Sequence, residues 1–443
     1  MAARTLRAMA RSGCRLLAAQ PAVSGTSAGV PMLEALPEGA SSRVGPAVWI
    51  QGPCAASQGL RAVQTAGFAG TSAEGGGIWS EGLKRNMVDL LAEEDGEAGS
   101  DDEAADPQSS PHYITASFCS QLAAEDVNKY WQMLPMGEGW PKGLTEEFQM
   151  SGTNFSLYRD CIHELFLEME RSFAALKQSQ LSGDDSALSE RRTHFLLQGT
   201  QGTGKSVALA SAVEFARLCG AVVVYVPSCL ELLDGGMYHR NEEAGGWDTP
   251  DHARRLLTNL LEAHGHRLDA VPSPGGEGSL KDVAEGGLSR NTNSVDAALE
   301  LIDALRETTA FPVVFAMDDY NALYSHTAYY EAVSFKKRRM IMPGELRLAS
   351  KLRMLEHEPL RNGVVLAAPT YSSCISPALK IPYKRGAIFS VPAFSEEELD
   401  RVAEFYADYD AIPERPEAAQ LLQIGALTCG NGKEFRKRVV LTV

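Results

Sequence analysis

Several features that would assign a protein class directly are missing from this 443-residue chain. No stretch approaches the roughly 18 consecutive apolar residues of a membrane-spanning helix, so we expect no membrane partner. No cysteines form a Cys-x-x-Cys pair or stand near histidines at zinc-site spacing, so neither a disulfide framework nor a zinc site is predicted. We expect buried thiols in a reducing compartment. The eight cysteines are Cys14, Cys54, Cys119, Cys161, Cys219, Cys229, Cys374 and Cys429.

Acidic residues are missing from the first 33 positions. Arg4, Arg7, Arg11 and Arg15 recur there at helical spacing, with leucines and alanines among them. An amphipathic, arginine-rich and acid-poor beginning is typical of an organelle transit peptide, and the continuous apolar core of a secretory signal is lacking. We therefore predict a transit peptide over residues 1–35, and prefer the mitochondrial matrix to the chloroplast. A disordered basic tail is the alternative.

Residues 36–110 lack a sustained hydrophobic period and are rich in Gly, Ala, Ser and Pro. They end in an acidic run between Asp89 and Asp106. Such a composition buries too little apolar surface to offset chain entropy, so we predict a disordered, low-complexity acidic arm. An ordered segment that docks on a partner is the alternative. The net charge of −16 argues against a surface that coats nucleic acid, but it allows local basic patches.

The rest of the chain alternates short apolar runs with helical stretches. Strands this apolar are buried on both faces, so the pattern predicts an α/β fold with a five-stranded, mainly parallel sheet between helices. We expect an N-terminal extension and helix over 111–192, a P-loop domain over 193–394 with an irregular insertion from Asp234 to Asn293, and a small helical unit over 395–443. The expected strands are Phe195–Leu197, Ala221–Val226, Pro312–Met317, Val364–Ala368 and Ala387–Val391.

Three helices have recognisable limits. The segment Ser151–Phe155 leads into a helix to about Gln178. Ser395 and the three glutamates after it form a capping box that opens a helix to about Asp410. The last helix is predicted over about Lys433–Val440. The apolar stripe of the first helix comprises Leu157, Cys161, Leu165, Met169 and Phe173.

One glycine-rich segment has the pattern of a phosphate-binding loop. Residues 199–206 are Gly-Thr-Gln-Gly-Thr-Gly-Lys-Ser, which fits the Walker A pattern between a strand and a helix to about Leu218. The curled backbone presents N–H groups to phosphate oxygens, and the helix N-terminus adds partial positive charge. We expect Lys205 on the β- and γ-phosphates and Ser206 on Mg²⁺; a glycine-rich turn that binds nothing is the alternative. The expected nucleotide-binding residues here are Gly199, Gln201, Gly202, Thr203, Gly204, Lys205, Ser206 and Val207.

An acidic pair follows the third expected strand. Asp318 ends the apolar run and is our candidate Mg²⁺ ligand, as in P-loop proteins that hold the metal through an acid on a neighbouring strand. Asp319 is the only candidate for a catalytic group, either polarising water or supporting the metal. Its side chain is one methylene shorter than the usual glutamate, which weakens that role. A turn capped by aspartate is the alternative for the pair.

The residues leave the base undecided between guanine and adenine. An Asn-Lys-x-Asp box is absent, because Asn128-Lys129 is followed by Tyr-Trp. Thr370 or Ser372 could contact the γ-phosphate, although a simple turn explains them equally well. Arg436 or Arg438 could reach the phosphates from the last helix, but surface positions are the preferred interpretation.

Three basic clusters with aromatic neighbours stand out in this acidic chain, and they suggest local contact with RNA phosphates. Each cluster alone is also explained as a solvated face. The clusters are Lys336-Lys337-Arg338-Arg339 beside Phe335, Lys380 with Lys384-Arg385 beside Tyr383, and Lys433 with Arg436-Lys437-Arg438 beside Phe435.

From about Trp140 onward the chain resembles the mitochondrial small-ribosomal-subunit proteins of the death-associated protein three family, which are AAA-like P-loop proteins. The resemblance lies in 147–155 (Glu-Phe-Gln-Met-Ser-Gly-Thr-Asn-Phe), in the P-loop, in 278–280 and 291–297, and in 316–324 around Asp318. The family usually has Gly after the Walker B acid, whereas Asp319 stands here. The acidic arm has no counterpart.

The resemblance implies a structural component of the mitochondrial small subunit head that binds GTP or GDP, with ATP as an alternative, together with Mg²⁺. It implies neighbouring small-subunit proteins, small-subunit rRNA and large-subunit proteins across the interface. From its position, Asn154 in the segment Ser151–Phe155 is expected at the base or ribose. Turnover is expected to be slow or absent, because no base or arginine finger is identifiable. The alternative function is a matrix AAA-type ATPase that acts as an oligomeric remodelling factor.

Overall fold

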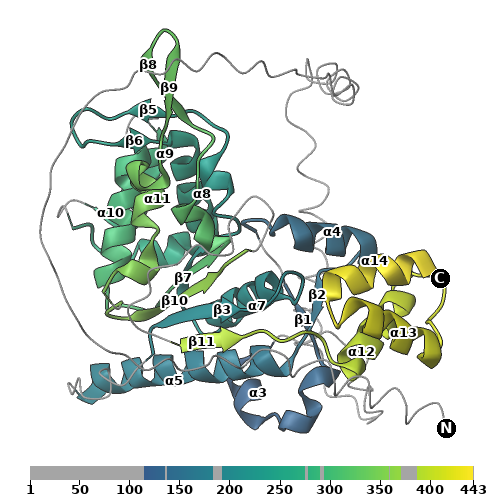
Figure 1. The fold of residues 1–443 in the computed structure, drawn as a ribbon. Helices are drawn as coiled ribbons and strands as arrows, with labels where there is room; N and C mark the ends of the chain where they lie inside the picture. Colours follow the sequence, from purple (N-terminus) through teal and green to yellow (C-terminus); the bar gives the residue numbers. More distant parts are fainter. Residues whose placement is uncertain are drawn as a thin grey trace, which may run out of the picture. The chain divides into compact units, whose positions relative to one another are not determined.

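A computed structural model describes residues 114–134, 137–182, 192–274, 278–289, 294–358, 360–370 and 387–442. The predicted transit peptide over 1–35 and the predicted acidic arm over 36–110 lie outside these residues. The described residues form a mixed α/β structure whose centre is one parallel five-stranded sheet (Figure 1).

The sheet is built from the five apolar runs that the sequence indicated. Its spatial order is β11-β3-β10-β7-β4, so the first strand along the chain lies between the fifth and the fourth. All neighbouring pairs are parallel, for example Leu366 opposite both Phe195 and Ala316. This arrangement is compatible with a P-loop-type fold. The strands are β3 (His194–Gln198), β4 (Val222–Val226), β7 (Val313–Asp318), β10 (Gly363–Ala368) and β11 (Ala387–Ser390).

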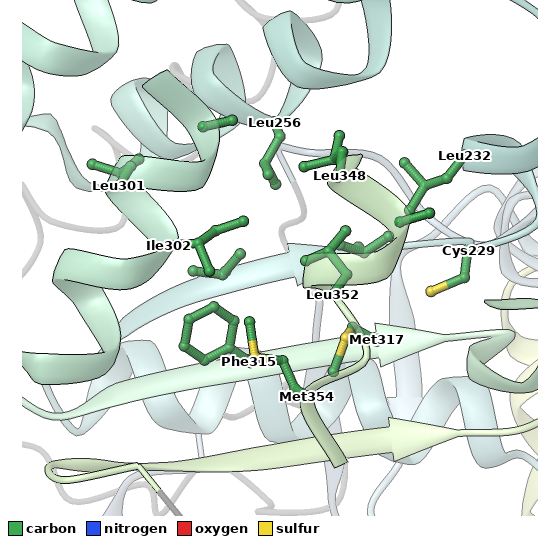
Figure 2. Close-up of a cluster of buried hydrophobic side chains, with 14 of the residues drawn as sticks. Cys229, Leu232, Leu256, Leu301, Ile302, Phe315, Met317, Leu348, Leu352 and Met354 are labelled. Carbon is green, nitrogen blue, oxygen red and sulfur yellow. The ribbon is translucent and has the colours of Figure 1, made fainter. Parts of the chain in front are cut away.

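Both faces of the sheet are buried, because successive strand residues enter different cores. Val314 and Ala316 of β7 pack with helices α5 (Asp160–Ser182) and α7 (Lys205–Leu218). Phe315 and Met317 enter the opposite core, where Figure 2 shows Phe315 near Ile302 and Met317 near Leu352. Helices α8 (Pro250–Leu268), α9 (Leu280–Ser289), α10 (Ser294–Glu307) and α11 (Arg347–Lys351) supply that second core.

The predicted irregular insertion from Asp234 to Asn293 is wrong for most of its length. Helix α8 starts with Pro250 at its first position and buries leucines at helical spacing, among them Leu256, Leu257 and Leu260. Helix α9 follows and packs on α8 and α10. The glycines and prolines of this region suggested an irregular structure, although the leucines of α8 recur at helical spacing. The segment is therefore a structural layer over one face of the sheet.

The helix predicted just after Phe155 begins later, at Asp160. Residues Phe155–Leu157 form the short strand β2, which pairs antiparallel with β1 (Trp131–Met133), so Leu157 does not belong to the helical stripe. Helix α4 (Lys142–Ser151) lies between these strands in sequence. Ahead of β1 come helix α3 (Ala116–Gln121) and the 3-10 helix η1 (Ala124–Lys129).

The C-terminal helices form a core of their own. Helix α12 (Glu396–Asp408) starts at the predicted capping box, with Ser395 and Glu398 bonded reciprocally. Helix α14 (Gly432–Thr442) confirms the predicted last helix, while α13 (Ala418–Thr428) was not predicted. Phe405 of α12 stacks on Trp131 of β1, with ring centroids 3.9 Å apart. The C-terminal core therefore also involves the segment that precedes α5.

Two small antiparallel pairs stand apart from the main sheet. Strands β5 (His239–Arg240) and β6 (Trp247–Asp248) form one pair, and β8 (Tyr330–Ser334) and β9 (Lys337–Met340) form a hairpin. Besides η1, the described 3-10 helices are η2 (Glu231–Leu233), η4 (Tyr320–Tyr324), η5 (Pro343–Glu345) and η6 (Met354–Glu356).

The expectation of buried thiols is only partly right. Cys119 and Cys229 are buried, Cys161 and Cys219 are half-buried, and Cys429 is exposed because it occupies a left-handed turn after α13. These five cysteines are unpaired. Among the described residues there is no cluster of three or more His, Cys, Asp or Glu side chains suited to a metal ion. No described helix is long and apolar enough to cross a membrane.

A buried carboxyl in α7 predicts a pH-dependent stability. Burial raises the pKa of Glu214 to about 7 from 4.5, against the opposing influence of Arg217. The stability from the neutral form is complete below the unfolded pKa and is lost as the pH rises through the folded pKa. We expect Glu214→Gln to raise the free energy of unfolding at about pH 8 by up to about 3 kcal/mol, with little change near pH 5.

Urea unfolding of both proteins at the two pH values checks this expectation. Glu262→Gln is the matched control, because Glu262 is an exposed carboxylate on α8. Equal pH profiles for Glu214→Gln and wild type would contradict it.

Candidate functional site

The glycine-rich loop joins β3 to α7 at the carboxyl edge of the sheet. Gly202 and Gly204 have φ values of +82° and +96°, a region that favours glycine over residues with a Cβ atom. The Thr203 hydroxyl donates to the Thr200 carbonyl at 3.0 Å and closes the loop from inside. Gly204 is the N-cap of α7, so the first helical N–H groups point towards the loop. The backbone thus has the curled form that the sequence pattern predicted.

Lys205 lies inside this curl. Its ammonium donates to the carbonyls of Gly199 at 2.9 Å and Thr200 at 2.8 Å. Burial lowers the pKa of Lys205, while the carboxylates of Asp318 and Asp319 act in the opposite direction. The structure therefore holds a cation at the mouth of the loop with two acids near it.

The acidic pair meets the loop across the sheet. The Ser206 hydroxyl is bonded to the Asp318 carboxylate, although the two residues follow different strands. Burial and the neighbouring Asp319 raise the pKa of Asp318. Magnesium prefers hard oxygen ligands, so a hydroxyl beside a carboxylate is a donor set that fits this ion. Ser206 and Asp318 are the described residues that could hold it.

Asp319 has different surroundings. Its φ of +52° marks a tight turn directly after β7. Its carboxylate accepts from the Ser228 hydroxyl at 2.7 Å and from the Thr370 hydroxyl, and burial raises its pKa. Asn321 fixes Thr370 in turn: its amide donates to the Thr370 carbonyl at 2.7 Å, and its oxygen accepts from the Thr370 N–H at 2.9 Å. Asp319 thus ties together the ends of β4, β7 and β10.

These groups open onto one cavity of ≈ 360 Å³, within the range of about 300–1,000 Å³ typical of ligand sites. Six of the eight predicted loop residues line it. Gly199 does not line it, and a Cβ at this position would stand 2.5 Å from the Val391 carbonyl oxygen. Thr203 is turned into the loop, and Asn154 donates to the Leu134 carbonyl at 3.4 Å, outside the lining. The lining includes Gln201, Gly202, Gly204, Lys205, Ser206, Val207, Asp318, Asp319 and Thr370.

A buried arginine joins the loop to the rest of the site. Arg159, just before α5, is 3% exposed and donates to Glu398 of α12 at 2.8 and 3.1 Å. It also donates to the Thr203 carbonyl at 2.9 Å, and its guanidinium lies 4.0 Å from the ring centre of Phe394. Remaining donors reach the carbonyls of Pro392 and Ala393. Nothing in the sequence around Arg159 marked it for this role.

The turn between α13 and α14 covers the glycine-rich loop. Asn431 donates its side-chain amide to the Gln201 carbonyl, and a Cβ at Gly202 would stand 2.2 Å from its oxygen. The Lys433 N–H reaches the Gly202 carbonyl at 3.4 Å. Gly202 is therefore required both by its backbone angle and by the close approach of this turn. Gln201 and Asn431 are 230 positions apart, so no local sequence pattern indicates this contact.

The opposite wall carries a carboxylate between apolar surfaces. Glu147 of α4 accepts from the Tyr406 hydroxyl and from Arg436 at 2.9 Å. Arg436 also reaches Glu146 at 3.4 Å. Arg436 is buried, so the surface position preferred from the sequence is wrong for this residue. Its pairing with these two acids supports a structural role over the phosphate contact. Apolar residues of this wall include Trp131, Leu144, Phe155, Leu157 and Phe405.

The family description "Mitochondrial ribosomal death-associated protein 3" fits residues 179–438. That match covers more than half of the sequence. The chain belongs to the mitochondrial ribosomal death-associated protein 3 family. The recognised resemblance is thereby confirmed, as is the expected location in the mitochondrial matrix.

Two relatives are named small ribosomal subunit protein mS29. The protein from Mus musculus is 26% identical over 188 residues, which cover 39% of this chain and 47% of the mouse protein. The protein from Bos taurus is 23% identical over 193 residues, which cover 39% of this chain and 46% of the bovine protein. The chain thus spans about half the length of these relatives. The comparisons give no support to the remodelling ATPase.

Several sequence expectations lie outside the described residues. These are Ser372 and the basic residues Lys380, Lys384 and Arg385. The other two basic clusters are described, on the β8–β9 hairpin and on α14.

The buried contacts of Arg159 predict the effect of its replacement on stability. Replacing it by methionine keeps most of the side-chain length but leaves Glu398 buried without its cation. Removing one partner of a buried pair costs about 3–5 kcal/mol, so we expect Arg159→Met to lower the free energy of unfolding by that amount. Urea unfolding followed by circular dichroism measures it.

Arg171→Met, on helix α5, is the matched control. Arg171 pairs with Glu168 at the surface and is 69% exposed, and such a pair contributes about 0–1 kcal/mol. Similar losses of unfolding free energy in the two variants would mean that the Arg159–Glu398 pair stabilises the fold no more than a surface pair does.

Proposed function

We propose that this protein is a structural component of the mitochondrial ribosomal small subunit that binds a guanine nucleotide with Mg²⁺. The observation that carries the nucleotide proposal is the convergence of Lys205, Ser206 and Asp318 at one cavity. The ribosomal proposal is supported by family membership and by the name of the relatives. Its neighbours would be small-subunit proteins, small-subunit rRNA reached through local basic patches, and large-subunit proteins across the interface.

Each polar group of the loop would have one role. Lys205 would bind the β- and γ-phosphates, and the amides from Gln201 to Val207 would bind the phosphate oxygens. Ser206 and Asp318 would hold Mg²⁺, which supplies positive charge beside the phosphates. The same contacts join the loop, the end of β7 and the turn before α14. A ligand that binds only the native state at a thousandfold excess over Kd would stabilise it by about 4 kcal/mol.

The surroundings of Asp319 favour binding over turnover. A general base must lie free to take a proton from the attacking water. Asp319 instead accepts from the hydroxyls of Ser228 and Thr370 and caps the strand ends. Among the described residues that line the cavity, Arg159 and Arg436 are the arginines, and both are paired with glutamates. Slow or absent GTP hydrolysis follows from this arrangement.

Glu147 supplies a reason to prefer guanine. Its carboxylate lines the cavity and already accepts from Tyr406 and Arg436. A carboxylate has about four acceptor positions and only accepts hydrogen bonds, so it can accept from a ligand as well. The Watson–Crick edge of guanine offers the N1–H and N2–H₂ donors side by side. Adenine offers an unprotonated N1 at the matching place. A base that enters this wall would therefore be selected as guanine.

The central prediction concerns Lys205. We expect Lys205→Ala to lower nucleotide occupancy and incorporation into the small ribosomal subunit together, because the bound nucleotide stabilises the incorporated fold. Sedimentation of gently lysed mitochondria, with the protein followed by mass spectrometry, measures incorporation. Nucleotide extracted from the same fraction measures occupancy.

Lys281→Ala is the control, because Lys281 is a partly exposed cation on α9 paired with Glu285, outside the cavity lining. Full incorporation of Lys205→Ala with an empty site would separate the nucleotide from assembly. Migration of the wild-type protein as a free particle of a few hundred kilodaltons would contradict the ribosomal proposal.

Base choice gives a second prediction. In Glu147→Gln a charged acceptor is replaced by an amide that also presents donors, so guanine loses a hydrogen bond worth about 1.5–3 kcal/mol. We expect Kd for GDP to rise roughly 10–100-fold, while the weaker binding of ADP changes little. Fluorescent nucleotide titration measures both.

Glu146→Gln is a close control: Glu146 also reaches Arg436 but does not line the cavity. Equal losses for GDP and ADP in Glu147→Gln would assign Glu147 to folding instead of base selection. Equal effects of both substitutions would have the same meaning.

A further inference from the structure

The β8–β9 hairpin has no role in the site described above. It projects from the helical layer at the top of Figure 1. Its register pairs Glu331 with Arg339 and Ala332 with Arg338, with an irregularity before the Ser334–Lys337 pair. Phe335 and Lys336 therefore form the tip.

The base of the hairpin is fixed by ion pairs. Arg339 donates to Glu331 at 2.8 Å and to Glu345 at 2.8 Å. Arg240 of β5 also reaches Glu331, at 3.1 Å. Arg339 is thus committed to holding the hairpin on the body of the protein, although the sequence groups it with the three cations before it.

The tip has a different character. Lys336, Lys337 and Arg338 are exposed, and no acidic residue occurs between Glu331 and Glu345. Phe335 is 102% exposed, so its whole ring faces solvent. An aromatic ring kept in water beside three cations contributes nothing to the described fold. The tip has a surface suited to an anionic partner that also offers flat apolar faces.

We propose that the hairpin tip binds unpaired RNA. Lys336, Lys337 and Arg338 would contact phosphates on the two sides of the tip, and Phe335 would stack on a base that is splayed out of a helix. The choice of RNA over other polyanions rests on the ribosomal function proposed above.

The shape and the charge of the tip favour RNA over a protein partner. A stable protein interface buries about 800 Å² on each side and has a charge-depleted centre, whereas this tip is narrow and its exposed ring stands among cations. The net charge of −16 also repels polyanions from the protein as a whole. RNA would therefore bind only at a local cluster of positive charge. Among the described residues, the hairpin tip is such a cluster, and it contains no acidic residue.

Fluorescence anisotropy of the full chain with a labelled, unstructured RNA of about 12 nucleotides tests the proposal. We expect Phe335→Ala to weaken binding roughly tenfold or more without changing the salt dependence, because stacking is uncharged. The triple variant Lys336→Ala, Lys337→Ala, Arg338→Ala should lower the slope of log K against log salt by about 2, from roughly 0.7 per phosphate contact. A duplex of the same length should bind without dependence on Phe335.

A triple substitution of exposed cations elsewhere, Lys129→Ala, Lys177→Ala and Arg361→Ala, controls for net charge. Wild-type affinity of the tip triple variant would overturn the proposal. So would a polyglutamate peptide that binds as tightly as RNA and responds equally to Phe335→Ala, since it would indicate an acidic protein partner.

Two further readouts separate this inference from the proposed function. Fluorescent nucleotide binding should be unchanged in all tip variants, which also reports that they fold. If the wild-type protein fails to sediment with the small subunit, the ribosomal proposal fails. If it sediments normally and the tip variants bind RNA as wild type, only the hairpin inference fails.

Discussion

The buried Arg159–Glu398 pair is the interaction on which the candidate site depends. One guanidinium joins the chain before α5, the backbone of the glycine-rich loop and the first turn of α12. Burying two charges is favourable only with good geometry and further hydrogen bonds, and Arg159 donates to three backbone carbonyls as well as to Glu398. The need to satisfy this cation fixes where the C-terminal helices stand over the loop.

The parallel sheet decides what the cavity contains. Strands β3, β10 and β7 are neighbours, so their carboxyl ends bring Lys205, Thr370 and Asp318 to one edge. The helices before and after the sheet add a second wall with Glu147 among aromatic rings. One end of the cavity is thus cationic and rich in backbone donors, and the other combines apolar side chains with the Glu147–Arg436 ion pair. In the proposed function, these ends would receive the phosphates and the base of the nucleotide.

Basic residues near each other in sequence have separate roles in the structure. Arg339 holds the hairpin base through Glu331 and Glu345, while Lys336 stands at the exposed tip. On α14, Arg436 faces the cavity wall and pairs with Glu147, whereas Lys437 pairs with Glu434 at the surface. Cluster composition alone does not distinguish these cases, because adjacent residues on a strand or helix point in different directions.

The sequence by itself determined the five strands, the helix after the glycine-rich loop and the Ser395 capping box, because hydrophobic runs, positive-φ glycines and caps act over a few residues. It also predicted Ser206 and Asp318 as ligands of one metal ion, from the P-loop pattern of an acid on a neighbouring strand. Only the tertiary structure decided the helical identity of 250–268, the β1–β2 pair, and the roles of Arg159, Asn431 and Glu147. Those residues act through partners between 44 and 289 positions away. Such contacts depend on how whole elements pack, and no local pattern encodes them.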